Sequence, residues 1–457
     1  MSATPSLSRR LGFGAVVAVI VGNMLGAGIF YTPGELAAVA ERTWQIYFFW
    51  ALCGAVTLCG ALTVAELAAL VPRAGATFHI IHDGFGPFWA FLKAWTDLWV
   101  TGPGSVAGIA ILFGELLTGA LGPAALGSPA GWGVLAIATL ALVNLAGLTW
   151  GARAQMATAT VKVLGLGGLV VGSMMFADAA VPPVDAAVAT GSVMSLLPLI
   201  GLGTAIVLFT YDGWLDVTHV AGEVVDPVRQ LPRGLVTGVS IVIALYLLVN
   251  HAFLRVVPLS DMRDAPTMVA PMVATAIFGP SGGAMLNTLM VVSIFGALGG
   301  VVMTVPRLLF AGASHYAELA RAAAPGVGRL VATLARVSSR KVPAGAILFC
   351  AVWSSAALLF FGSFSRIVAF FVVPVQVANI LIVAAVFRFR RRGLGAPGGY
   401  RTPGYPLVPL VYIGVLSLLL ATTVAFNPTD TLIGVALTAT GAPVYGWLTR
   451  AARTQHG

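Results

Sequence analysis

Three glycines fall close together in an apolar stretch near the start of the chain. The stretch runs from Val21 to Phe30 and contains Gly22, Gly26 and Gly28. Glycine destabilises a helix interior by about 1 kcal/mol relative to alanine, so we expect the helix to break here. The N–H groups that start the second half-helix can hold an anion, and the carbonyls that end the first half-helix can hold a cation. An α-amino acid offers both groups, a carboxylate and an ammonium.

A second interruption of this kind lies in a later apolar stretch. Phe209 is followed by the turn-like run Thr210-Tyr211-Asp212-Gly213, and apolar residues resume at Trp214. Irregular backbone at membrane depth is tolerated only where protein or a water-filled cavity covers it. Paired interruptions at corresponding positions in the two halves of a chain indicate the binding site of a transporter. Other glycines, such as Gly299 and Gly300, are interpreted as sites of close helix packing.

The composition predicts the elements that hold the two breaks. Of 457 residues, 58% are apolar and 9% are charged, whereas soluble domains carry about 25% charged residues. Membrane-spanning helices need about 20 mostly apolar residues each. We therefore predict an all-α integral membrane protein with 12 transmembrane helices, of which the first and sixth are discontinuous. The spans are expected at 12–39, 44–71, 86–118, 130–149, 157–177, 196–222, 234–257, 283–311, 343–362, 366–387, 407–425 and 431–449.

The net charge of +9 is explained by orientation in a membrane and not by binding to nucleic acid. Nineteen of the 25 Lys and Arg residues lie on the N-terminal side of these spans, and four lie on the other side. This bias predicts that both termini are cytoplasmic. The three cysteines have the spacing of neither a zinc site nor a disulfide framework. The first apolar stretch lacks a cleavage site and is expected to be a retained helix.

Both breaks resemble a known family. The run Gly26-Ala27-Gly28-Ile29-Phe30 resembles the Gly-Ser-Gly-Ile-Phe motif of the amino acid–polyamine–organocation transporter superfamily, with Ala27 in place of serine. The stretch from Phe209 to Pro232 resembles the L-type amino acid transporter branch of that superfamily. Its matching residues are Tyr211, Gly213, Trp214, Glu223, Asp226, Pro227, Arg229, Leu231 and Pro232.

The resemblance implies one transmembrane domain, 1–457, with a LeuT-like fold. It implies a first five-helix repeat at 10–178, an inverted second repeat at 195–388, and peripheral helices 11 and 12 at 406–450. Such a protein works by alternating access, carries L-amino acids and commonly exchanges them. We expect neutral amino acids as substrates.

The resemblance also implies how the substrate is held. Its carboxylate would meet the N–H groups of Ala27 and Gly28. Its ammonium would meet carbonyls near Gly22, Phe209 and Thr210, and Phe209 would cover the site as a gate. The full set of expected substrate-binding residues is Gly22, Gly26, Ala27, Gly28, Phe209, Thr210, Tyr211, Asp212 and Gly213.

Lys162 lies well inside the fifth apolar stretch, where a lysine costs about 2.5–3.5 kcal/mol on insertion scales. One explanation is a snorkelling side chain. The other is an ammonium that donates to exposed carbonyls near Gly22. The resemblance supports the second, because this branch carries a lysine where sodium-coupled relatives bind an ion. We therefore expect Lys162 to substitute for sodium, and transport to be sodium-independent.

Two sets of charged residues allow two interpretations each. Asp212 either faces the pocket and attracts a cationic side chain, or caps the second half-helix. Asp-Gly is ordinary turn chemistry, which favours the cap. Glu223, Asp226 and Arg229 either lie in a solvated loop or, as the resemblance suggests, form an internal gate or hinge network with Arg153 or Arg233.

His79, His82 and Asp83 could bind a metal in a membrane-bound enzyme, but no further ligand cluster is evident. A channel lacks support, since no filter motif or acidic ring is found. Proton-coupled uptake or exchange of cationic amino acids or polyamines is the alternative that remains open.

We therefore expect a transporter and not an enzyme, with no cofactor and no metal. Its partners are a small-molecule amino acid and the lipid bilayer. No disulfide-linked heavy chain is expected, because the loop at 119–131 has no cysteine. The compact loops suggest a prokaryotic inner (plasma) membrane.

Overall fold

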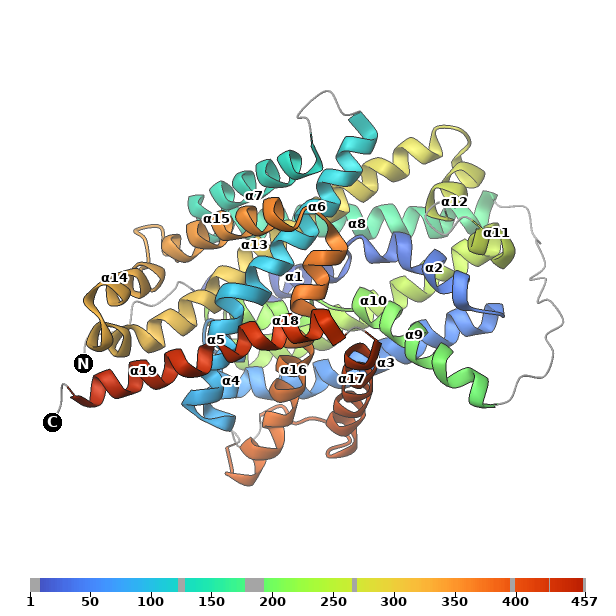
Figure 1. Ribbon diagram of the computed structural model, residues 1–457. Coiled ribbons are helices and arrows are strands. Elements are labelled where there is room, and N and C mark those ends of the chain that lie inside the picture. Colours follow the sequence, from blue (N-terminus) through green and yellow to red (C-terminus); the bar gives the residue numbers. More distant parts are fainter. Residues whose placement is uncertain are drawn as a thin grey trace.

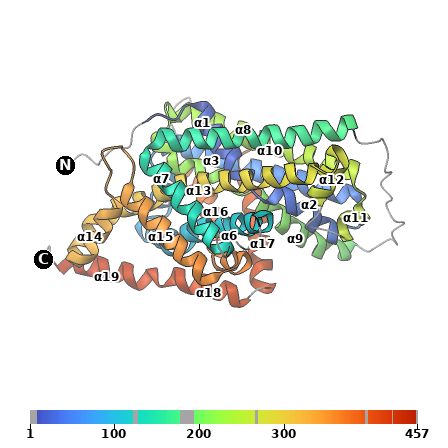
Figure 2. The same ribbon diagram turned by 90° about the horizontal axis from the view of Figure 1, so that it is seen from above.

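The computed structural model describes residues 9–121, 128–176, 193–264, 269–394, 399–426 and 428–454. Within these ranges the chain forms helices joined by turns and short irregular segments, with an isolated parallel bridge between Leu11 and Val224. The all-α prediction is confirmed. Figures 1 and 2 show α14 (Pro325–Leu334) and the end of α19 (Gly441–Thr454) at one end of the molecule. The short helices α11 (Leu259–Asp264) and α12 (Val269–Phe278) lie at the opposite end.

Ten of the described helical stretches are long and apolar enough to cross a bilayer. The pair α1 (Phe13–Met24) and α2 (Gly28–Val39) makes an eleventh when it is counted as one bent span. Helix α9 (Val193–Thr210) is not among them, so the predicted number of twelve is not confirmed. The ten are α3 (Thr43–Leu70), the run Pro87–Leu121, α7 (Pro129–Ala146), α8 (Leu148–Phe176), α10 (Pro227–Val256), α13 (Gly282–Ala323), α15 (Ala344–Phe361), α16 (Phe364–Arg391), α17 (Leu407–Phe426) and the run Leu432–Arg453 of α18 (Pro428–Ala439) and α19.

The first span breaks where the glycines predict. Helix α1 ends at Met24, α2 begins at Gly28, and the two axes differ by 40°. The amide of Gly26 turns back to donate to the Met24 carbonyl at 2.8 Å. The chain therefore leaves the helix between Met24 and Gly28, as the first prediction requires.

The sixth span breaks at its Asp-Gly pair. Helix α9 ends at Thr210, and Gly213 takes a left-handed conformation, with φ of 100°. A glycine reaches this region without the steric penalty that other residues meet. After the turn the chain continues as a 3₁₀ helix, η2 (Trp214–Glu223), which the sequence did not indicate.

Three local features differ from the predicted spans. The third span contains a π-helical segment, η1 (Asp97–Thr101), between α5 (Pro87–Thr96) and α6 (Gly102–Leu121). Gly147 alone separates α7 from α8, because its φ of 137° turns the chain in one residue. Helix α13 continues to Ala323, beyond the predicted end of its span at residue 311.

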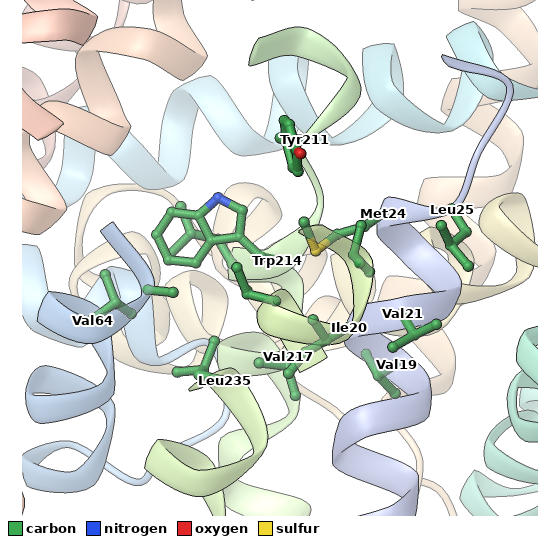
Figure 3. Close-up of a cluster of buried hydrophobic side chains, with 14 of the residues drawn as sticks. Val19, Ile20, Val21, Met24, Leu25, Val64, Tyr211, Trp214, Val217 and Leu235 are labelled. Atoms are coloured by element: carbon green, nitrogen blue, oxygen red, sulfur yellow. The ribbon is translucent and has the colours of Figure 1, made fainter. Parts of the chain in front are cut away.

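A large apolar core surrounds the broken first span. Figure 3 shows Tyr211 and Trp214 among side chains of α1, α3 and α10, which include Met24, Val64 and Leu235. The Tyr211 hydroxyl donates to the Trp50 carbonyl at 3.0 Å. Packing of the turn residues on α1 and α3 thus fixes one break against the other.

Candidate substrate site

The two breaks are in direct contact. A Cβ atom built on Gly28 would lie 2.6 Å from Cγ2 of Thr210, so only glycine fits at this position. The hydroxyl oxygens of Thr32 and Thr210 are 2.6 Å apart and share a hydrogen bond. On the other side of the turn, Gly213 packs against the backbone of Asn23. The N-terminus of α2 and the C-terminus of α9 therefore meet.

A cavity of about 1020 Å³ opens at this meeting point. Its volume lies at the upper end of the usual range for ligand pockets, about 300–1,000 Å³. Spans one, three, six, eight and ten all contribute to its lining. Seven of the nine predicted substrate-binding residues line it: Gly26, Ala27, Gly28, Phe209, Thr210, Asp212 and Gly213.

The other two predicted residues, Gly22 and Tyr211, lie outside the cavity lining, which corrects the prediction for both. Tyr211 is fully buried and serves packing. The carbonyl of Gly22 already accepts a hydrogen bond from Lys162. Neither the glycine spacing nor the turn motif could show which side of the backbone faces the cavity.

The N-terminus of α2 presents free donors to the cavity. Ala27 occupies its N-cap position, and no side chain caps it. The first N–H groups of a helix lack intrahelical partners and attract anions. Gly28 opens the helix on the cavity side, so a carboxylate can approach the backbone closely here.

Several carbonyls of the breaks already have donors. The Tyr246 hydroxyl donates to the carbonyl of Met24 at 2.6 Å and to that of Thr210 at 3.2 Å. The Ser293 hydroxyl donates to the carbonyl of Leu25 at 3.0 Å. A carbonyl has two lone pairs, so Thr210 keeps one acceptor position for a substrate ammonium.

Lys162 on α8 points at the first break. Its Nζ lies 2.6 Å from the Gly22 carbonyl oxygen, and the side chain is fully buried. Gly296 on α13 makes room for it, because a Cβ there would lie 3.0 Å from Cε of Lys162. This geometry excludes the snorkelling explanation. The role of Lys162 in transport stays a prediction.

A chain of buried polar side chains, which the sequence did not reveal, joins spans five, one and six. Nε2 of Gln155 donates to Oδ1 of Asn23 at 3.0 Å. Nδ2 of Asn23 donates to Oδ2 of Asp216 at 2.8 Å. Gly300 packs so closely on this chain that a side chain there would collide with Asn23. Asn23, a polar residue inside the glycine-rich apolar stretch, was the one sequence signal that could have indicated these hydrogen bonds.

The cap interpretation of Asp212 is wrong. The cap position of η2 belongs to Gly213, and no side chain caps it. The Asp212 side chain is exposed and lines the cavity. The 3₁₀ geometry of η2 shifts its start by one residue from the helix that the Asp-Gly pattern suggested.

Glu223 has a partner other than the one expected. Its carboxylate binds Arg307 on α13, with distances of 3.2 and 3.3 Å to Nε and Nη2, and both side chains are fully buried. Neither Arg153 nor Arg233 takes this position. Arg229 instead makes an exposed ion pair with Asp226 at 4.0 Å, so it is not joined to Glu223.

Two further aspects of the lining concern charge and aromatic cover. Lys93 and Asp97, four residues apart in span three, form an ion pair in the cavity wall. Phe209 is 45% exposed, and its ring makes an edge contact with Phe364 at 6.2 Å between centroids. Both rings line the cavity, and the gating role of Phe209 stays a prediction.

The histidine cluster is more crowded than the sequence indicated. Nδ1 of His82 lies 2.9 Å from Asp83, and the His82 and His315 rings are 4.5 Å apart. No group of three His, Cys, Asp or Glu suited to a metal occurs among the described residues.

Comparisons with known proteins agree with this geometry. The family described as amino acid permease matches residues 11–447. The chain is 26% identical to the serine/threonine exchanger SteT of Bacillus subtilis, over 96% of both chains. It is 26% identical to the human large neutral amino acids transporter small subunit 2, over 96% of this chain and 80% of that one. It is 24% identical to the mouse b(0,+)-type amino acid transporter 1, over 99% of this chain and 92% of that one.

These relatives are transporters, so the metal-dependent enzyme is set aside. The match covers both breaks, the cavity and nearly every described helix. The chain therefore belongs to the amino acid permease family of multi-pass membrane proteins.

Proposed function

We propose that the protein is a sodium-independent exchanger of L-amino acids, with neutral amino acids among its substrates. The observation that carries this proposal is the N-terminus of α2 at the cavity, beside Thr210. Its free N–H groups suit a carboxylate, and the remaining acceptor of Thr210 suits an ammonium. Both groups are common to all α-amino acids, so the backbone recognises the class and the cavity walls select the side chain.

Sodium independence is supported by Lys162. The ammonium group bonds the Gly22 carbonyl at 2.6 Å and ties α8 to the first break. A bound cation could satisfy the same carbonyl. The lysine amine already occupies that position, so no sodium ion is needed to hold the break in place.

Exchange and neutral substrates are supported by the relatives. One is called an exchanger of serine and threonine, and another a transporter of large neutral amino acids. At about a quarter identity these names suggest the mechanism and the substrate class without fixing either. Ala27 offers no hydroxyl to the substrate, so recognition at the first break falls on the backbone.

The proposed mechanism is alternating access. Two inverted repeats, 10–178 and 195–388, would tilt against each other, and helices in 406–450 would lie outside them. Phe209 would cover the bound substrate on one side. The buried Glu223–Arg307 pair would close the other side, since it joins the end of η2 to α13.

The basic-residue bias supports cytoplasmic termini. The compact loops support a prokaryotic plasma membrane. The loop at 119–131 lacks a cysteine, so we propose that no heavy chain is disulfide-linked there. Residues 122–127 of this loop lie outside the described residues.

A second candidate, the transport of cationic amino acids or polyamines, is favoured by one observation. Five acidic residues and one basic residue line the cavity among the described parts of the chain. Such an excess attracts positive charge.

Counterflow in proteoliposomes tests the proposal. Liposomes are loaded with unlabelled leucine, serine or alanine, and uptake of the labelled amino acid is followed with and without sodium and with and without a proton gradient. We expect uptake that requires unlabelled amino acid inside the liposomes and that does not change with sodium or with a proton gradient. Uptake into empty liposomes driven by sodium or protons would contradict exchange, and flux that does not saturate would indicate a channel.

A further inference from the structure

Helix α14 is too short to cross a bilayer. Its 10 residues extend over about 15 Å. It packs against α13 and α15 at one end of the molecule (Figures 1 and 2). Two glycines fix this packing, because a Cβ on Gly328 would lie 2.6 Å from Cα of Arg321, and one on Gly345 would collide with the carbonyl oxygen of Thr333. Helix α14 therefore has a fixed place beside both spans.

The outer face of α14 carries apolar side chains. Leu330 is 57% exposed and Val327 is 39% exposed. The two residues are three positions apart, so they share one face of the helix. Gly328, which packs on α13, lies on the opposite face. A helix that combines such an apolar face with basic residues typically lies in the interface of a bilayer.

The helix against which α14 packs has a lipid-facing surface. Helix α15 is apolar and long enough to cross a bilayer, and its side chains Leu348 and Val352 are more than half exposed. Thr333 of α14 contacts Gly345 in the first turn of α15. Helix α14 therefore lies where the exposed apolar surface of this span ends, which is the depth of the lipid headgroups.

The segment that contains α14 has an excess of positive charge. Between residues 312 and 342 the acidic residue is Glu318, whereas five residues are basic. All five basic side chains are exposed, and none forms an ion pair with a described residue. They are Arg321, Arg329, Arg336, Arg340 and Lys341. This charge is thus available to an anionic partner.

The same end of the molecule carries a further aromatic and basic pair. Nη1 of Arg340 donates to the carbonyl of Leu145 at 3.3 Å, at the end of α7. The turn at Gly147 then leads to Trp150, which is exposed, and Cζ of Arg153 lies 5.7 Å from the centre of its ring. Tryptophan and arginine are both enriched where a membrane protein passes the headgroups.

We propose that an exposed surface at this end, formed by Val327, Arg329, Leu330, Arg336 and Lys341 and called the basic interface below, binds anionic phospholipids. The three basic side chains would hold headgroup phosphates, for which the guanidinium fork is well suited. Val327 and Leu330 would contact the acyl chains. A soluble acidic partner would match the charge, but the apolar pair and the lipid-facing span beside it favour a lipid.

The experiment measures lipid binding by the purified full chain. Native mass spectrometry from a neutral detergent gives apparent Kd values for phosphatidylglycerol, which is anionic, and for phosphatidylcholine, which has no net charge. We expect the wild type to bind phosphatidylglycerol more tightly. Arg329→Gln and Arg336→Gln should each weaken this binding about fivefold, since a basic residue near an anionic surface contributes about that factor. Equal Kd values for the two lipids would overturn the inference.

Two further variants locate the binding. Arg366→Gln removes the same charge from an exposed arginine at the start of α16 and is the matched control, which should bind phosphatidylglycerol as the wild type does. Loss of affinity in this control equal to that of Arg329→Gln would show that net charge, and not the basic interface, attracts the lipid. Leu330→Ser should weaken the binding of both lipids. If it changes neither, and soluble polyglutamate displaces the lipid, the surface belongs to an acidic protein and the inference fails.

A measurement on the wild type keeps the test valid if the variants fail to fold. Phosphatidylglycerol in mixed micelles should raise the melting temperature more than phosphatidylcholine does. Added salt should reduce the difference, because it screens exposed charges. Equal melting temperatures in the two lipids would contradict the proposed surface. These measurements contain no amino acid, so their outcome is independent of the exchange proposed above.

Discussion

The ammonium nitrogen of Lys162 lies 2.6 Å from the carbonyl oxygen of Gly22, which joins the fifth span to the break in the first. Both groups are out of reach of water, because Lys162 is fully buried. The first break therefore has a fixed anchor on a neighbouring helix. Its orientation does not depend on the substrate alone.

Replacement of Lys162 should release the first break from the fifth span. In Lys162→Met the Gly22 carbonyl loses its donor in a buried place, which costs about 1–3 kcal/mol. We expect counterflow to fall at least about tenfold, with a lower melting temperature. Val161→Met, which changes an exposed neighbour on the same helix, is the control. Normal exchange by Lys162→Met would remove Lys162 from the mechanism.

Gly28→Ala should separate the two breaks. The added methyl group would lie 2.6 Å from Cγ2 of Thr210, so α2 and α9 must move apart. We expect the KM for leucine to rise at least about tenfold, since a small displacement of positioned groups is costly. The control is Gly14→Ala, because nothing lies within 4 Å of the added Cβ. Equal KM values for Gly28→Ala and the wild type would contradict the proposed carboxylate site.

The buried Glu223–Arg307 pair should be essential for stability. Arg307→Gln leaves the Glu223 carboxylate without its partner, and breaking a buried pair costs about 3–5 kcal/mol. The exposed Arg229–Asp226 pair is the internal comparison, and Arg229→Gln should cost about 0–1 kcal/mol. Thermal unfolding of both variants in detergent measures the difference. Similar melting temperatures would show that burial does not govern the contribution of these pairs.

Phe209→Ala should open the gate. The variant loses the ring that meets Phe364 over the cavity. We expect labelled leucine to leak from loaded liposomes without external substrate, several times faster than through the wild type. Phe360→Ala is the control, because that ring is 83% exposed and outside the cavity lining. Efflux that still requires external amino acid would argue against a gating role.

Helix type and the positions of both breaks were predictable from composition and glycine spacing. Apolar runs of membrane length stand out in a chain with so few charges, and Gly26, Gly28 and Gly213 weaken a helix at mid-span. The Gly22 carbonyl was predicted as the partner of Lys162 through the family resemblance, whereas the lone charge in an apolar span was also compatible with a snorkelling side chain. The cavity lining followed from these positions for seven of nine residues.

The pairing of distant side chains was not predictable. Asn23 joins Gln155 and Asp216 across three spans, and Arg307 reaches Glu223 from α13. Such contacts depend on how helices rotate about their axes, which local spacing does not determine. The cap position of η2 was missed because a 3₁₀ helix and an α-helix start differently from the same Asp-Gly turn.

The bridge between Leu11 and Val224 ties the first described residues to the end of η2. Arg10 and Leu11 both donate backbone hydrogen bonds to the carbonyl of Glu223, whose side chain holds Arg307. A segment attached ahead of Arg9 therefore leads directly to the residue that holds the buried Glu223–Arg307 pair. Affinity tags and reporter fusions at the other terminus avoid this contact.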